Sequence, residues 1–344
     1  MTNMMVFRFI DCRNHDGEWQ QAFNRYWPAY KRWFLSNGIE QRETLEACEK
    51  AIHEQMPELG ELYHHLCQSA GNHDLAARFL SMYCPPAYLT GCSQLATWTG
   101  GHPVLIRNYD YSPRLFEATV MLTNWSGKLV IATIDSLWGC LDGVNEDGLA
   151  VSLTFGGSRK VGTGFGIPII LRYLLQTCGT AAEAVSALKR VTCNMAYNVT
   201  LTDCTGDACT VELFPDHPIA LSNETFAANH QSVNHWPAYT KKTRSVERMA
   251  VLRELNANHR DTEAQAITEA FQTPPLRSDT YDRGFGTLYT CMLHPRKRSV
   301  DYFWGCKKIS QSIKHFDACD VQIGLTRPSD GIGRLQPPTF FTED

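Results

Sequence analysis

The hydrophobic periodicity of this chain changes in blocks, and the order of these blocks restricts the fold more than any other feature. Before Pro85 and Pro86, apolar residues recur at helical spacing over residues 18–83. After these prolines come short apolar runs separated by turn residues, which are typical of strands. A helix pair, more strands, two helices and a closing strand pair follow. Helices and strands grouped in runs predict an α+β fold of packed layers rather than alternating βαβ units.

The individual elements follow from the same patterns. Helices are expected at residues 19–34, 42–56, 58–66, 74–82, 167–177, 181–191, 243–255 and 262–271. Strands are expected at residues 104–107, 118–123, 128–134, 149–154, 198–202, 209–213, 219–221, 225–228, 287–293 and 299–303. Ser126-Gly127 predicts a hairpin turn, and Thr180 with Glu183 predicts a capping box. Because the sequence has no internal repeat or low-complexity linker, we expect one domain with the N-terminal helical segment packed against it.

Composition narrows the function classes. The 344 residues are 43% hydrophobic and carry a net charge of -4, as expected for an ordinary globular chain. The one basic run, at residues 296–298, is too short to follow a phosphate backbone, so we expect no nucleic-acid partner. No apolar run approaches the roughly 18 residues of a membrane helix, so we expect no membrane partner. The N-terminal apolar run is too short for a secretory signal, and we therefore expect a cytoplasmic protein.

The cysteine pattern favours free thiols. There are 13 cysteines, an odd number, with no C-x-x-C pair, which is typical of buried, reduced side chains. The cluster His64, His65, Cys67 and His73 matches no standard metal-ligand spacing, and adjacent histidines point to different faces of a helix. We therefore interpret this cluster as a helix surface and expect no metal.

Cys92 is the one cysteine with a separate argument for reactivity. A thiol needs a base, and no Cys-His signature is present. If Cys92 were the first residue of a chain, its own amine, with a pKa of about 7.7–8.0, could serve as that base. This requires a cut between Gly91 and Cys92, and a residue without Cβ can take the strained conformation needed for attack on its carbonyl. A buried, structural Cys92 remains the alternative.

Three further polar sites follow strand-like runs. Arg107 and Asp110 belong to the segment RNYD, Asn145 lies in GVNEDG, and Asn229 ends a strand in AANH. Each also has a structural explanation. Arg107 and Asp110 could form a surface ion pair, Asn145 could serve only the turn, and Asn229 could simply terminate its strand.

These motifs together resemble a known family. The ordered set GCS, RNYD, GVNEDGLAV, AYNVTLTDCTGD, AANH and RGFGTLYT is similar to the N-terminal-nucleophile hydrolases that include isopenicillin N acyltransferase, the C45 peptidase family. Choloylglycine hydrolases and acid amidases are more distantly similar. The similarity covers roughly residues 85–305 and includes a Cys-to-Asp interval of eighteen residues. It implies a four-layer αββα sandwich, with residues 1–91 as pro-segment or small chain and residues 92–344 as catalytic domain.

The resemblance also implies roles for single residues. Cys92 resembles the nucleophile, its amine the base, and Asp110 the carboxylate that holds this amine. Arg107 resembles the arginine beside the thiolate in the choloylglycine and acid amidase branches. Asn229 resembles the oxyanion donor, and Asn145 the second asparagine of the site.

Arg283 resembles the arginine before the last hairpin, although a solvated surface charge is the alternative interpretation. The N-terminal 84 residues depart from the family, because they lack the small glycine-bearing motif that usually opens these proteins.

The expected function is hydrolysis of linear N-acyl amide C–N bonds through an acyl-enzyme on Cys92. Arg107 favours hydrolysis, because isopenicillin N acyltransferase resembles this chain but has glutamine at that point. The alternatives are transfer of the acyl group to an amine, and an uncut small-molecule binding protein of the same fold. The expected partner is a small N-acyl amide or acyl donor, no cofactor is implied, and a homo-oligomer is compatible with the sequence.

The tryptophans bear on the substrate. They are core residues by default, or they line a pocket for an apolar acyl group, and the residues concerned are Trp125, Trp138, Trp236 and Trp304.

Overall fold

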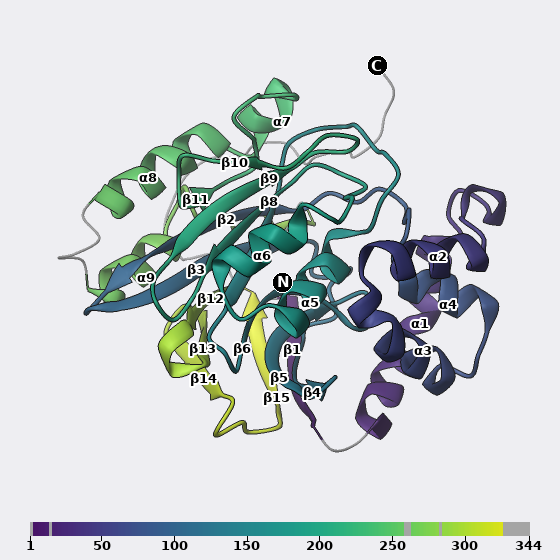
Figure 1. The fold of residues 1–344 in the computed structure, drawn as a ribbon. Coiled ribbons are helices and arrows are strands. Elements are labelled where there is room, and N and C mark those ends of the chain that lie inside the picture. Colours follow the sequence, from purple (N-terminus) through teal and green to yellow (C-terminus); the bar gives the residue numbers. More distant parts are fainter. Residues whose placement is uncertain (1–2, 14–15, 258–262, 282–283, 326–344) are drawn as a thin grey trace.

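Two stacked β-sheets with helices on their outer faces form the protein (Figure 1). The computed structural model describes residues 3–13, 16–257, 263–281 and 284–325. Helices α5 and α6 lie on the larger sheet, and α8 and α9 lie on the smaller one. The predicted four-layer αββα arrangement is therefore confirmed.

The larger sheet has nine strands in the order β10-β9-β8-β7-β6-β5-β4-β1-β15. Its strands are β1 (Asn3–Cys12), β4 (Thr119–Trp125), β5 (Lys128–Asp135), β6 (Gly139–Asn145), β7 (Ala150–Phe155), β8 (Tyr197–Thr202), β9 (Ala208–Leu213), β10 (Ala220–Leu221) and β15 (Cys319–Leu325). Neighbours are antiparallel except β1 and β4, which are parallel. The β4–β5 hairpin turns at Ser126 and Gly127, which both have positive φ, as predicted.

The smaller sheet has six antiparallel strands in the order β11-β2-β3-β12-β13-β14. They are β2 (Gly91–Thr99), β3 (His102–Tyr111), β11 (Phe226–Ala227), β12 (Gly286–His294), β13 (Ser299–Trp304) and β14 (Lys307–Ser312). One face of β2, β3 and β12 packs against the larger sheet, and the other packs under α8 and α9. The nucleophile candidate lies at the start of β2.

The helices are of two groups. Those before the first proline pair are α1 (Asp16–Phe34), α2 (Leu45–Gln55), α3 (Gly60–Ser69) and α4 (Asp74–Ser81). Those of the sandwich are α5 (Ile167–Thr177), α6 (Ala181–Leu188), α7 (Pro237–Lys242), α8 (Ser245–Ala257) and α9 (Ala264–Phe271). The capping box of Thr180 and Glu183 at the start of α6 is confirmed.

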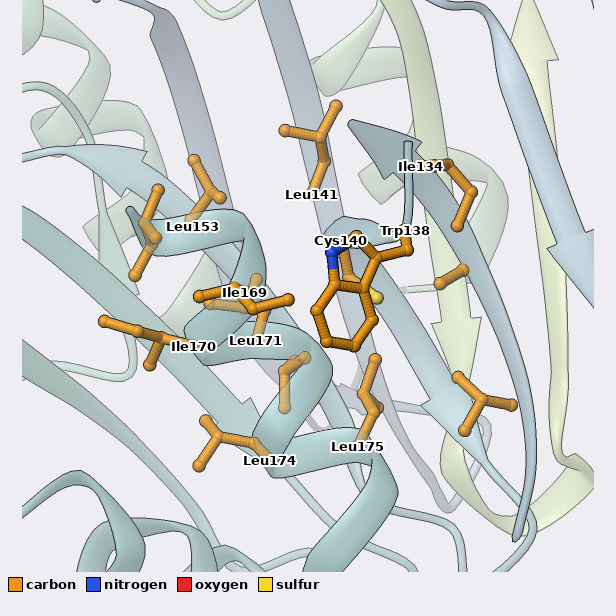
Figure 2. Close-up of a cluster of buried hydrophobic side chains, with 14 of the residues drawn as sticks. Ile134, Trp138, Cys140, Leu141, Leu153, Ile169, Ile170, Leu171, Leu174 and Leu175 are labelled. Carbon is orange, nitrogen blue, oxygen red and sulfur yellow. The ribbon is translucent and has the colours of Figure 1, made fainter. Parts of the chain in front are cut away.

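Helix α5 is buried on nearly all sides, because it lies between the larger sheet and the N-terminal helices. Ten of its eleven residues are buried, as expected for a helix that is apolar all round. Figure 2 shows Leu171 and Leu175 beside the ring of Trp138, which comes from the turn before β6. The indole N–H of Trp138 donates to the carbonyl of Leu80 at the end of α4. This contact joins the N-terminal helices to the core of the sandwich.

The sequence predicts a helical N-terminal segment, and this prediction is wrong for its first residues. Residues 3–12 form β1, which pairs with β4 on one side and β15 on the other. Its inward side chains, Met5, Phe7 and Phe9, alternate with more exposed ones. The chain before Gly91 therefore contributes an inner strand, next to the edge strand β15, and a cut after Gly91 would leave it held by these hydrogen bonds.

Three further observations concern the cysteines, the helices and the possible metal ligands. All 13 cysteines are free, as predicted. No helix within the described ranges is long and apolar enough to cross a membrane. Among the same residues, no three His, Cys, Asp or Glu side chains are grouped so as to hold a metal ion.

A buried acidic cluster joins α1 to the larger sheet. The hydroxyl of Tyr30 bonds a carboxyl oxygen of Glu117 and lies 2.7 Å from Oδ1 of Asp135. The same hydroxyl accepts the backbone N–H of Ser136 at 2.9 Å. A phenol has one proton, so it cannot donate to two carboxylates, and one of the two carboxyls must itself be protonated. Burial, followed by the charge of Asp135, raises the pKa of Glu117 to about 8, so we assign the proton to Glu117.

This cluster predicts that the folded chain loses stability as pH rises. Unfolded glutamic acid has a pKa of about 4.3, whereas that of folded Glu117 is about 8. The protonated Glu117 stabilises the folded chain fully below the pKa of the unfolded state, and this stabilisation is lost as pH rises through the pKa of the folded state. The loss is about 1.4 kcal/mol for each pH unit between the two pKa values. Urea unfolding of the uncut Cys92→Ala chain between pH 5 and 9 measures this loss.

Glu117→Gln, which keeps one donor and one acceptor, should flatten the pH dependence in that background. Exposed Glu61→Gln should leave it unchanged. A Glu117→Gln chain with the full slope of its parent would contradict the proton assignment.

Candidate active site

Cys92 is the second residue of β2 and is fully buried between the two sheets. It pairs with Tyr109 of β3, which places it on the same face of the sheet as Arg107. The nitrogen and the sulfur of Cys92 each have a polar partner. The backbone N–H donates to Oδ1 of Asn229 at 3.1 Å, and Sγ lies 3.0 Å from Nη2 of Arg107. Both atoms that a one-residue catalytic centre requires are thus in polar contact.

Arg107 is held rigidly under the sulfur. Its Nη1 donates to the carbonyl of Leu141 at 2.8 Å and to Oδ2 of Asp142 at 3.0 Å. Asp142 is fully buried and also accepts the hydroxyl of Tyr289 at 2.5 Å. A buried guanidinium needs such a counter-charge, because an unpaired charge in the interior is very costly. Asp142 was not predicted, although a carboxylate inside the apolar β6 was a visible signal.

Asp110 lies on the opposite face of β3 and forms a second buried ion pair. Its Oδ2 is 2.6 Å from Nη1 of Arg248 on α8, and its Oδ1 accepts the hydroxyl of Thr287 at 2.5 Å. Arg107 and Asp110 are both fully buried and each pairs with a different partner. The alternative that they form a surface ion pair is therefore wrong. Arg248 was not predicted, since nothing in its helix distinguishes it from other arginines.

Asn229 follows β11 and is brought to Cys92 by the smaller sheet, in which β11 pairs with β2. Its Oδ1 accepts the N–H of Cys92, while its Nδ2 makes only a long 3.4 Å bond to the carbonyl of Phe155. Its own backbone N–H donates to Oγ of Ser245 at 2.7 Å. The side chain thus presents an acceptor to the nitrogen of Cys92 and a weakly used donor beside it.

The peptide groups around the Gly91–Cys92 bond are each held in place. The carbonyl of Thr90 accepts the hydroxyl of Tyr239 at 3.0 Å, and the carbonyl of Cys92 lies 3.4 Å from Nη1 of Arg248. Gly91 pairs regularly with Asp110 and is not among the residues with positive φ, so the strained backbone that we expected is not observed. Glycine is required here for another reason. A Cβ at Gly91 would lie 2.7 Å from the ring of Phe285.

The thiol of the uncut chain is protonated and closed off. Burial raises the pKa of Cys92, and the charge of Arg107 only partly opposes this effect. In the uncut chain Cys92, Arg107, Asp110 and Asn229 have no exposed surface.

Asn145 is not part of this cluster. Its Nδ2 donates to the carbonyls of Leu175 and Cys178 at the end of α5, and its Oδ1 accepts the N–H groups of Gly148 and Leu149. These four bonds use the whole capacity of the amide. In the uncut chain the amide of Asn145 is thus used by the turn and by the end of α5, and its predicted role in the site stays a prediction.

Arg283 lies outside the described residues, so its predicted role stays a prediction. Of the four tryptophans, Trp125 and Trp138 are core residues. Trp236 stacks on Tyr239, and Trp304 lines a cavity.

That cavity, of about 270 Å³, opens beside the first half of β12 and the end of β13. It is lined by Gln272, Arg277, Tyr281, Thr287, Tyr289, Thr290, Phe303, Trp304, Gly305, Cys306, Gly324 and Leu325. Thr287 links the cavity to the site, because its hydroxyl donates to Asp110. The lining combines four aromatic side chains with polar residues and the charged side chain of Arg277.

Comparison with known proteins agrees with the resemblance. The family model described as acyl-coenzyme A:6-aminopenicillanic acid acyl-transferase matches residues 98–308, a range that begins six residues after Cys92. The chain has no significant match among curated protein sequences.

Several solved structures are similar at low identity. A mutant of conjugated bile acid hydrolase from Clostridium perfringens has a TM-score of 0.47 and 14% identity, covering 71% of this chain and 100% of that one. The Caenorhabditis elegans ortholog of N-acylethanolamine-hydrolyzing acid amidase has a TM-score of 0.46 and 16% identity, covering 67% and 98%. Penicillin V acylase from Agrobacterium tumefaciens has a TM-score of 0.44 and 12% identity, covering 65% and 86%.

Proposed function

The chain belongs to the acyl-coenzyme A:6-aminopenicillanic acid acyl-transferase family and is thus an enzyme of N-acyl amide bonds, and we propose that Cys92 is its nucleophile. The enzyme becomes active when the Gly91–Cys92 bond is cut. One observation carries this proposal. The sulfur of Cys92 lies against Arg107, while its nitrogen lies against Asn229, so both halves of a one-residue catalytic centre already have their partners.

The first step is the cut itself. The sulfur attacks the carbonyl carbon of Gly91, the C–N bond to Cys92 breaks, and the nitrogen leaves with the thiol proton as a free amine. Water then hydrolyses the Gly91 thioester and releases the carboxylate of Gly91. The clamps on Thr90 and on the carbonyl of Cys92 support this step, because they fix the peptide groups on both sides of the bond.

Turnover then uses the new amine. It takes the thiol proton, the thiolate attacks the carbonyl of the substrate, and Nδ2 of Asn229 donates to the oxyanion. Oδ1 of Asn229 lies 3.1 Å from the nitrogen and holds the ammonium. The ammonium then protonates the leaving nitrogen, which completes the acyl-enzyme. Arg107 stabilises the thiolate between these steps.

The acyl-enzyme passes to water in a hydrolase or to an amine in an acyltransferase. The buried arginine beside the sulfur favours water, as we expected from the sequence. The family match is the observation that keeps transfer as the second candidate. The cavity next to Thr287, with four aromatic side chains and Arg277 in its wall, supports an amphipathic acyl substrate.

Acyl-enzyme trapping tests this proposal. Cut protein is mixed with a panel of N-acyl 7-amido-4-methylcoumarins, quenched in acid and examined by intact mass. The fragment that begins at Cys92 should gain the mass of one acyl group, because the thioester survives acid. Release of coumarin with no acylated fragment, and with Cys92 still open to alkylation, would remove the nucleophile assignment.

The same reaction separates the two candidate outcomes. Added glycine amide should leave the free acid as the main product if the enzyme is a hydrolase. If most acyl groups instead appear as the acylated glycine amide, the acyltransferase is correct.

A further inference from the structure

We propose that Arg248 is a positioning residue for turnover, which balances Asp110 and so keeps the amine of Cys92 able to act as a base. This inference rests on the proposed function, because it concerns the amine that the cut creates. The contacts of Arg248 themselves are observed in the uncut chain and do not depend on that proposal.

Arg248 connects three parts of the site. Its Nη1 lies 2.6 Å from Oδ2 of Asp110 and 3.4 Å from the carbonyl of Cys92. Its Nε donates to the carbonyl of Pro275 at 2.9 Å, in the segment that leads to β12. The side chain is 5% exposed. An arginine held by three such contacts has one conformation, so Asp110 and the nucleophile strand are fixed relative to α8.

The first turn of α8 holds the oxyanion residue as well. Ser245 lies three residues before Arg248, on the same side of the helix. Its Oγ accepts the backbone N–H of Asn229 at 2.7 Å and bonds Nδ1 of His230 at the same distance. One helical turn thus positions both Asp110 and Asn229. A buried ion pair with only a folding role would not require this second attachment.

Charge balance gives Arg248 its specific effect. The titratable and charged groups facing Cys92 come from five elements: Arg107, Tyr109 and Asp110 of β3, Asp142 of β6, Tyr239 of α7, Arg248 of α8 and Tyr289 of β12. The two arginines and two aspartates cancel, and the tyrosines are neutral because burial raises the pKa of each.

Without Arg248, Asp110 would be an unbalanced anion beside the amine and the thiol. A nearby negative charge favours the ammonium and disfavours the thiolate. A higher pH would then be needed to remove the proton that blocks attack. Loss of Arg248 should therefore shift the acid limb of the pH profile of kcat/KM to higher pH. A lysine at this position should leave that limb unchanged.

The test compares Arg248→Gln and Arg248→Lys with a matched control on the same helix. The control is Arg253→Gln, since Arg253 pairs with Glu224 at the surface. The probe is an N-acyl 7-amido-4-methylcoumarin that the cut wild type hydrolyses. Arg248→Gln should raise the pH of half-maximal kcat/KM on the acid side by about one unit. Arg248→Lys and Arg253→Gln should keep the wild-type limb. An unmoved limb in Arg248→Gln, or an equal shift in Arg248→Lys, would overturn the inference.

A double variant covers the case in which Arg248→Gln does not fold. Breaking a buried pair leaves a lone charge, whereas removing both partners is far less destabilising. Asp110→Asn with Arg248→Gln should therefore fold, and its kcat/KM should be within about threefold of that of Asp110→Asn alone, because coupled residues are not additive. A further tenfold loss would mean that Arg248 acts independently of Asp110. A wild type that is uncut or inactive would instead overturn the proposed function, whatever Arg248 does.

Discussion

Replacement of Cys92 by alanine should leave the purified protein as a single chain of 344 residues and lower kcat by roughly 10⁶-fold, the loss typical of a missing nucleophile. Both effects have one cause, since the same sulfur cuts the chain and carries the acyl group. Intact mass under denaturing conditions gives the first result, and hydrolysis of an N-acyl coumarin amide gives the second. A Cys92→Ala chain that is still cut after Gly91 would contradict the mechanism.

The matched control is another buried cysteine far from the site. Cys193 is free and buried, so Cys193→Ala removes a thiol of the same kind without touching Arg107 or Asn229. It should be cut and should turn over like the wild type. Native size-exclusion should show the two wild-type fragments eluting together, because β1 pairs with strands of the other fragment.

A wild type that remains one chain would favour the binding-protein alternative. In that state the thiol is fully buried and its pKa is raised by burial, so alkylating reagents should react slowly at Cys92. Fast alkylation of the uncut chain would contradict the burial of this thiol. A precursor that is cut should be labelled faster at Cys92 after the cut, whereas a binding protein should stay a single chain that is not labelled at Cys92.

The layered fold was predictable because its signals are local. The apolar pattern of α5 indicates both ends of that helix, and the capping box indicates the start of α6, within the sequence itself. Strand β1 was missed although Met5, Phe7 and Phe9 alternate as in a half-buried strand. The short apolar run of this segment was compared only with the length of a secretory signal. Strand β2 was missed because its residues are almost all buried, so that no alternation is visible.

The site was predictable only where a motif supplied it. The segments around Cys92, Arg107, Asp110 and Asn229 meet in space, although up to 137 residues separate them. The role of Asn145 stays a prediction, because a turn of the same composition also satisfies an asparagine completely. Arg248 could not be found, because a partner for Asp110 that lies on a distant helix is fixed by tertiary packing and leaves no pattern in the sequence.

Asn229→Ala should lower kcat by about 10²–10³-fold while KM changes little, because an oxyanion donor acts only in the transition state. The donor and the acceptor of this amide can be tested separately. Asn229→Asp keeps Oδ1 for the nitrogen of Cys92 but lacks the Nδ2 donor, so it should lose as much kcat as the alanine variant. An aspartate variant with near wild-type kcat would mean that Asn229 serves only to hold the amine. A rise in KM with unchanged kcat in both variants would make it a binding residue, and the oxyanion would then require another donor at the start of β2.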